Sequence, residues 1–119
     1  AAKIYWADML SGYVERSDFD GTNIETISDW ANMPTCVAVD HAAGKAYWVV
    51  YGTGELQRGN VDGNGRIETI ATGVSTPYGV AIDGTNRKLY WSQSANGRIR
   101  RCDLDAAACV PETFREQLG

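Results

Sequence analysis

Proline, histidine and cysteine are scarce in this chain, and no run of apolar residues is long. Three prolines, three cysteines and one histidine occur among 119 residues. The longest apolar stretch, Ala46 to Tyr51, is far shorter than the ~20 residues that a membrane-spanning helix needs. The chain does not open with the basic and then apolar segments of a signal peptide. We therefore expect no membrane insertion, and a mature secreted protein would show the same features.

Motifs for metal binding, nucleophilic catalysis and phosphate binding are also missing. The cysteines form no Cys-x-x-Cys pair and no cluster with histidine, so we expect no metal and no cofactor. No nucleophile elbow or P-loop is present. The single histidine, His41, follows a VAVD segment in an expected turn, where a solvated side chain is a simpler interpretation than a general base. The chain therefore offers little for catalysis.

Positive charge is in short supply, because the formal net charge is −4. Phosphate contacts need clustered lysine and arginine, so we expect no nucleic-acid partner. Several aspartates lie in or beside expected hairpin turns, where bonding to the turn backbone is the simpler interpretation and calcium binding is the alternative. The DGNG turn at Asp62–Gly65 lacks the further carboxylates of a calcium loop. The aspartates concerned are Asp18, Asp20, Asp62, Asp103 and Asp105.

The cysteines divide into one spaced pair and one isolated residue. Cys102 and Cys109 lie seven residues apart around a turn-like DLDAAA stretch. If they close a hairpin, a small disulfide is feasible and would favour an oxidising, secreted or extracellular setting, whereas two reduced thiols are the alternative. Cys36 lies in the apolar segment CVAV, and we expect a small buried hydrophobic residue there.

What the chain does contain is a repeat of 42 to 43 residues. The dipeptide Tyr-Trp occurs three times, 42 and then 43 residues apart, and its flanking landmarks keep the same register. Glu-Thr-Ile recurs at 25–27 and 68–70, and a proline precedes both VAVD and VAID. The repeats span about 1–34, 35–77 and 78–119 of a single domain. The landmarks are Tyr5-Trp6, Tyr47-Trp48 and Tyr90-Trp91, lysines Lys3, Lys45 and Lys88, glycines Gly12, Gly54 and Gly97, and arginines Arg16, Arg58 and Arg101.

Within one repeat, alternating apolar residues and frequent turn signals indicate short antiparallel strands. In the middle repeat we expect strands at Thr35–Asp40, Lys45–Val50, Glu55–Val61 and Arg66–Ala71. Four strands in one such repeat are typical of a β-propeller blade. The sequence therefore predicts an all-β fold of about three four-stranded blades. The first blade starts at its second strand and the last ends in a strand at Val110–Leu118, so we expect about eleven strands.

The repeat resembles the YWTD repeats of the low-density-lipoprotein-receptor class B β-propellers. The family's Tyr-Trp-Thr-Asp motif reads YWAD at Tyr5–Asp8, YWVV at Tyr47–Val50 and YWSQ at Tyr90–Gln93, and the resemblance spans nearly the whole chain. It implies a ring of six blades, of which this chain supplies about half. The resemblance also implies ties between blades through hydrogen bonds and ion pairs. The residues in these ties would be Asp8, Arg16, Arg58 and Arg101.

Half a ring leaves the sheet faces of both end blades open to water, with tyrosine and tryptophan on them. A two-fold homodimer would cover those faces and close a six-bladed ring, and a fragment of a longer chain is the alternative. We expect Trp6, Trp48 and Trp91 to pack between sheets at equivalent positions.

Large apolar side chains also stand where the repeat needs only turn residues. In propellers, the connections from strand two to strand three and from strand four to the next blade share one rim. An exposed apolar cluster there indicates an interaction surface, although packing into interfaces is the alternative. Asp8 could add to its polar edge. The candidate ligand-binding residues are Met9, Leu10, Trp30, Met33, Val50, Tyr51, Tyr78 and Gln93.

The sequence therefore favours a non-catalytic module that binds a protein, peptide or small molecule at the channel mouth. The alternatives are an enzyme of the propeller lumen, such as a cyclase or lyase, and a structural piece of a receptor ectodomain. Lumen catalysis would need acid or base groups on the first strands of the blades. Those strands offer only Thr35, Cys36 and Tyr78, which favours binding.

Overall fold

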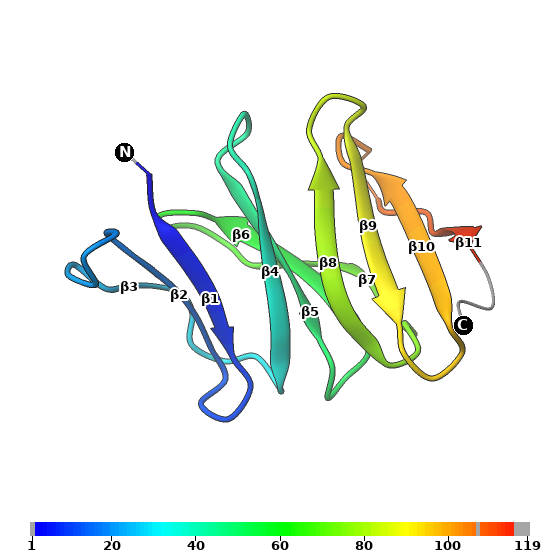
Figure 1. Ribbon diagram of the computed structural model, residues 1–119, viewed down its shortest axis with the longest axis horizontal. Helices are drawn as coiled ribbons and strands as arrows, with labels where there is room; N and C mark the ends of the chain where they lie inside the picture. Colours follow the sequence, from blue (N-terminus) through cyan, green and yellow to red (C-terminus); the bar gives the residue numbers. More distant parts are fainter. Residues whose placement is uncertain (1, 107, 116–119) are drawn as a thin grey trace.

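The computed structural model describes residues 2–106 and 108–115, which form an all-β structure (Figure 1). Eleven strands are found in these residues, arranged in three antiparallel sheets that follow one another along the molecule. The first sheet comprises β1 (Ile4–Asp8), β2 (Tyr13–Ser17) and β3 (Glu25–Ser28). The second comprises β4 (Pro34–Asp40), β5 (Lys45–Val50), β6 (Glu55–Asn60) and β7 (Glu68–Ala71). The third comprises β8 (Pro77–Asp83), β9 (Lys88–Gln93), β10 (Arg98–Asp103) and β11 (Glu112–Arg115).

The expected strands of the middle repeat are confirmed, with small shifts at their ends. The expected strand at Lys45–Val50 coincides with β5, whereas β7 begins two residues later than expected. The preceding turn extends further, and in it the side-chain amide of Asn60 donates to the backbone carbonyl of Asn64. The last expected strand, Val110–Leu118, begins two residues later than predicted, at Glu112; β11 is described as far as Arg115, and the rest of the expected strand lies outside the described residues.

One arginine clamp and one lysine clamp recur in every sheet. Each arginine donates from Nε to a glutamate on the last strand of its own sheet, and each lysine donates to the residue that ends or follows the strand before it. The arginine pairs are Arg16–Glu25 at 3.0 Å, Arg58–Glu68 at 2.9 Å and Arg101–Glu112 at 2.6 Å. The lysine pairs are Lys3–Asp18 at 2.6 Å, Lys45–Asn60 at 2.7 Å and Lys88–Asp103. These arginine pairs differ from the implied ties between blades, because the nearest carboxylate lies on the adjoining strand of the same sheet.

An ion pair between sheets is formed by Arg87, a residue that was not predicted from the sequence. Arg87 lies in the β8–β9 turn, and its two Nη atoms donate to the carboxylate of Asp40 at 2.9 and 2.6 Å. Its Nε donates to Asp105 at 3.0 Å. Asp40 ends β4 and is buried, and the hydrogen bonds from Arg87 hold the pKa of its carboxyl below the ordinary value.

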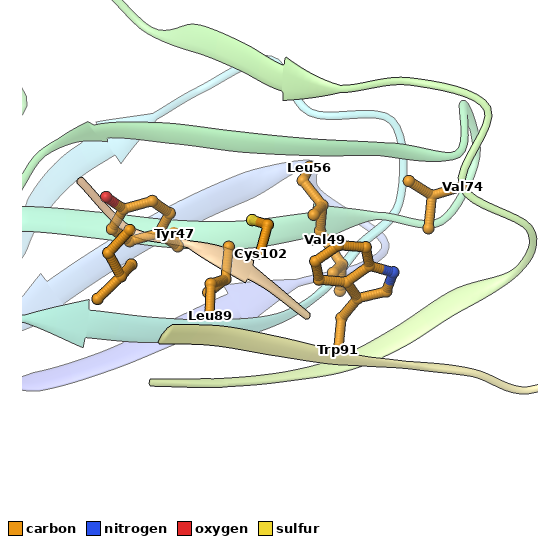
Figure 2. Packing of buried hydrophobic residues seen from close by; sticks show 8 residues of the cluster. Tyr47, Val49, Leu56, Val74, Leu89, Trp91 and Cys102 are labelled. Carbon is orange, nitrogen blue, oxygen red and sulfur yellow. The ribbon is translucent and has the colours of Figure 1, made fainter. Parts of the chain in front are cut away.

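Two apolar cores hold the three sheets together, and β5 contributes to both. Alternate residues of a strand point to opposite faces, so Trp48 packs toward the first sheet and Val49 toward the third. Figure 2 shows the core between the second and third sheets, where Trp91 lies against Val49 and Leu56. Trp48 and Trp91 are buried, whereas Trp6 is only half-buried because its side of the first sheet has no sheet against it.

The cysteines are placed at different depths. A disulfide joins Cys102, at the end of β10, to Cys109, before β11. Cys36 is free and half-buried, and its Sγ lies 3.7 Å from the carbonyl oxygen of Val80 on the next sheet. Within residues 2–106 and 108–115 there is no helix long and apolar enough to cross a membrane.

Candidate binding cleft on the turn rim

A cleft of about 310 Å³ opens on the rim where β1 turns into β2 and the chain crosses from β3 to β4. Four of the eight predicted ligand-binding residues meet there, namely Met9, Leu10, Trp30 and Met33. The rim runs along the lower edge of Figure 1. The other residues that line the cleft were not predicted, although they flank the predicted ones in sequence. They are Ser11, Gly12, Asp29, Ala31 and Asn32.

Gly12 and Ala31 line the cleft and join the two segments that form it. The Ala31 amide donates to the Gly12 carbonyl at 3.0 Å, which ties the crossing segment to the β1–β2 turn. Gly12 has a φ of +81°, and a Cβ there would lie 2.7 Å from the Ala31 carbonyl oxygen. Only glycine fits this position without displacing the crossing segment. Asp8 closes the turn by accepting from the amides of Leu10 and Ser11, which lowers its pKa.

The same kind of hydrogen bond continues along the rim. The Tyr51 amide donates to the Met33 carbonyl at 3.0 Å, and the Val74 amide donates to the Gly54 carbonyl at 2.9 Å. Backbone hydrogen bonds therefore join the hairpin turns to the segments that cross between sheets along this rim. Met33 has a φ of +62°, and Thr76, at the equivalent position of the next crossing, has a φ of +44°. Since both crossings share this conformation, it belongs to the repeat rather than to the cleft.

Two side chains of the cleft stand almost wholly in solvent. Leu10 is 97% exposed and Trp30 is 91% exposed, whereas Met33 is exposed to a smaller degree and Met9 is half-buried. An indole with this exposure contributes little packing within the described structure. Grouped with three other large apolar side chains, it forms the kind of patch that marks an interaction surface.

A second aromatic group lies next to the cleft along the rim. The rings of Tyr51 and Tyr78 meet edge to face with centroids 6.4 Å apart, and both residues are exposed. Tyr51 is joined to the cleft through its amide bond to Met33. The two predicted tyrosines therefore extend the apolar rim from the first crossing toward the third sheet.

Two of the predicted rim residues are buried instead. Val50 is 1% exposed and packs between the first and second sheets, and Gln93 is 3% exposed. The Gln93 carboxamide lies 3.3 Å from the indole nitrogen of Trp91 and accepts its hydrogen bond. Both residues are last in their strands and point toward the preceding sheet, so neither offers its side chain to a ligand on the rim.

The electrostatic character of the cleft comes from one carboxylate. Asp29 is the charged residue among those that line it, and in the described part of the chain no hydrogen bond or ion pair involves its side chain. Asp8 and Glu55 lie on the same rim, and Arg98 begins β10 there. The rim is therefore weakly acidic around an apolar centre.

The remaining candidates serve the turns or the ladders. Asp20 and Asp62 accept from backbone amides within their own turns, as turn aspartates do. Asp18, Asp103 and Asp105 instead pair with Lys3, Lys88 and Arg87. Over residues 2–106 and 108–115, no group of three or more histidine, cysteine or acidic residues is placed to hold a metal ion. His41 is exposed on the opposite rim, where it lines a hollow together with Asp40 and Arg87.

Two side chains of β4, the first strand of the second sheet, donate to backbone carbonyls of β8, the first strand of the third sheet. The Thr35 hydroxyl donates to the Tyr78 carbonyl at 2.6 Å, and the Cys36 thiol donates to the Val80 carbonyl. These two side chains therefore join β4 to β8. The Tyr78 ring belongs to the rim pair with Tyr51.

The fold is shared with solved structures, although no family model matches the chain. A crystal structure of a nidogen/laminin complex is similar over 96% of this chain and 44% of that one, with a TM-score of 0.85 and 20% identity. A luciferin-regenerating enzyme is similar over 95% of this chain and 45% of that one, with a TM-score of 0.65 and 13% identity. The chain spans less than half the length of either structure. At these identities the likeness shows the fold alone, which is part of a β-propeller.

Proposed function

We propose that this chain is part of a YWTD-type propeller and works as a non-catalytic binding module, which takes a protein or peptide segment in the rim cleft. One observation carries the proposal. Four large apolar side chains converge on the cleft, and two of them, Leu10 and Trp30, are left almost wholly in water.

The exposed indole supplies the binding energy. Covering a tryptophan ring completely is worth up to about 4 to 6 kcal/mol of apolar transfer free energy, before the losses of association are subtracted. Because Trp30 has no packing role in the described structure, a partner would gain this contribution without disturbing the fold. Tryptophan is also among the residues enriched at the centres of binding energy in interfaces.

A peptide segment fits the rim better than a compact small molecule does. The cleft is open, and the tyrosine pair continues its apolar surface toward the third sheet. Asp29 offers an acceptor beside Trp30 for a backbone amide or a cationic side chain. A structural neighbour solved in complex with laminin is consistent with protein binding.

The cellular setting and the assembly are part of the same proposal. The Cys102–Cys109 disulfide supports a secreted or extracellular location, because such bonds persist in oxidising compartments. We also propose that a second copy of the chain completes a six-bladed ring around the channel. All the residues that line the cleft belong to the first repeat, so the proposed binding requires no residue of a second copy.

The test selects peptides from a random 12-residue phage-displayed library on the wild-type protein and measures their affinity for variants. Trp30→Ala and Leu10→Ser should each weaken the selected peptides by about tenfold or more, as loss of an interface anchor does. Phe19→Ser is the matched control, because Phe19 is 70% exposed but lies in the β2–β3 turn, outside the cleft. If Trp30→Ala binds the selected peptides as tightly as the wild type, the cleft is not the binding site.

A further inference from the structure

We infer that the open face of the third sheet is a socket for Trp6 of a second copy, so that two copies join head to tail. The inference rests on the proposed six-bladed ring and goes beyond it, because it assigns which face meets which and by what side chains. It is independent of the rim cleft, which lies on neither end face.

The two internal interfaces establish the direction of insertion. Trp48 of the second sheet packs toward the first, and Trp91 of the third packs toward the second. In both of these sheets, the tryptophan of the second strand therefore packs against the sheet that precedes it. By the same rule, Trp6 of the first sheet points away from the rest of the chain, toward a sheet that the described structure does not contain.

The opposite end of the chain presents a receiving face. Toward the following sheet, the first and second sheets offer Val14 and Leu56, and both are buried. The equivalent residue of the third sheet is Ile99, which has the same place in its strand and is only half-buried. The third sheet therefore carries the same kind of apolar face without the cover.

Strand register adds a second residue to this face. Arg101 is opposite Glu112 in the ladder, as Arg16 is opposite Glu25, so the third sheet continues the Glu-Thr-Ile pattern as Glu-Thr-Phe. Phe114 is therefore the counterpart of Ile27. Ile27 is 4% exposed and Phe114 is 52% exposed, although it lies edge to face against Tyr90.

A hollow of about 290 Å³ lies in this face between β8, β9 and β10. At these repeat positions the third sheet has the smaller residues Gly79 and Ser92 where the second sheet has Cys36 and Val49. The hydroxyl of Ser92 accepts from the Gly79 amide at 3.0 Å, which turns that polar group into the sheet. The residues around the hollow are Gly79, Val80, Ala81, Tyr90, Trp91, Ser92 and Ile99.

The inserting face offers side chains of matching size. Ile4 and Trp6 hold the positions of Leu89 and Trp91, which fill the core between the third and second sheets. Leu89 and Trp91 are buried, whereas Ile4 is 44% exposed and Trp6 is half-buried. The chain thus exposes, at opposite ends, the two halves of an interface that it builds twice within itself.

At the position of Asp83, charge does not oppose this contact. Asp83 holds the repeat position of Asp40, whose carboxylate pairs with Arg87 of the following sheet. The first sheet would supply no such arginine, because Ala2 holds the repeat position of Arg87 there. Asp83 is already satisfied within its own turn, where the Asn86 amide group donates at 2.8 Å and the Thr85 backbone amide at 3.1 Å. No incoming cation is required there.

Closure follows from symmetry. A single contact of this kind would leave one inserting face and one receiving face open, whereas a two-fold arrangement buries both pairs at once. An arrangement without closure would grow into a chain of copies, so the size of the assembly reports directly on the geometry.

The test measures sedimentation velocity at micromolar concentration for the wild type, Trp6→Glu and Ile99→Glu, with Trp30→Glu as the matched control. We expect a dimer for the wild type and the control. Each face variant should dissociate, with a dimer dissociation constant raised about 30-fold or more. Both variants change residues with partly exposed side chains, and their far-ultraviolet circular dichroism should match the wild type. If Trp6→Glu fails to fold, Trp6→Ser takes its place.

Mixing the two face variants tests the pairing itself. In a head-to-tail dimer, Trp6→Glu mixed with Ile99→Glu keeps one intact interface, so the mixture should form a dimer although neither variant does alone. A pairing of like faces would show no such rescue and would overturn the inference. A wild-type monomer, or a ladder of larger assemblies, would overturn the two-copy closure.

Discussion

Arg87 of the third sheet donates two hydrogen bonds, of 2.9 and 2.6 Å, to the buried carboxylate of Asp40 in the second sheet. The two residues are 47 positions apart, and the pair joins neighbouring sheets on the rim opposite the candidate cleft. Arg87 occupies the repeat position of Gly44, and both have a positive φ, of +56° and +64°. An arginine in this conformation is held by its contacts rather than by its backbone preference.

Loss of Arg87 should destabilise the protein. We expect Arg87→Ala to lower the free energy of unfolding by about 2 to 3 kcal/mol, because it leaves Asp40 buried without its partner. The matched control is Lys88→Ala, whose partner Asp103 is mostly exposed, and there the loss should stay below about 1 kcal/mol. Urea unfolding of both variants measures the difference. Equal losses would mean that the pair between sheets has no special weight.

The same pair makes stability depend on acid. The hydrogen bonds from Arg87 lower the folded-state pKa of Asp40 below 3.8, so its contribution is complete above about pH 4. The contribution is lost as pH falls below that value toward the depressed folded pKa. Asp40→Asn removes the titrating group, so its stability should fall less steeply with acid than that of the wild type. Thermal unfolding between pH 2 and pH 6 gives both slopes, and parallel curves would contradict the assignment.

Trp48 and Trp30 should differ sharply in their contribution to stability. Trp48→Ala should cost about 3 to 5 kcal/mol, because the indole fills the core between the first two sheets and donates to Gln57 at 2.9 Å. Trp30→Ala should leave the unfolding midpoint almost unchanged, since its ring stands in solvent. Denaturant unfolding of the two variants is the measurement. Similar losses would show that Trp30 packs against something in solution.

Two glycines allow the cleft to be separated from the fold. Gly12 and Gly54 both have positive φ, and a Cβ on either would approach a crossing carbonyl to 2.7 or 2.6 Å. Substitution of each by alanine should cost about 1 to 3 kcal/mol of stability. Only Gly12→Ala disturbs the cleft, so it alone should weaken the peptides selected on the wild type. Equal binding by both variants would argue that the crossing segment does not shape the site.

Much of the fold could be predicted from sequence, because the signals for it are local. Alternating side chains, repeated turn residues and the Tyr-Trp landmarks mark the strands of the middle repeat to within a residue or two at most ends. Four cleft residues were also found this way, since Met9, Leu10, Trp30 and Met33 are large and apolar where turn formers suffice. Such residues are recognised because the equivalent positions of the other repeats hold different residues.

Other features depend on what each sheet packs against, which alternation along a strand does not report. Val50 and Gln93 end strands on the rim side, and only the preceding sheet decides that they are buried. Phe114 lies one residue later than the repeat spacing predicts, so its equivalence to Ile27 is not visible in the sequence. The pairing of Arg101 with Glu112 in the ladder shows that equivalence.

The sequence by itself determined the repeated strands and the apolar character of the rim, because periodicity and turn chemistry act over a few residues. Only the tertiary structure decided the partners of charged groups. Arg16, Arg58 and Arg101 pair within their own sheets, whereas Arg87 reaches the neighbouring one. An ion pair forms with the carboxylate that is near in space, and the packing of sheets sets that nearness across tens of residues.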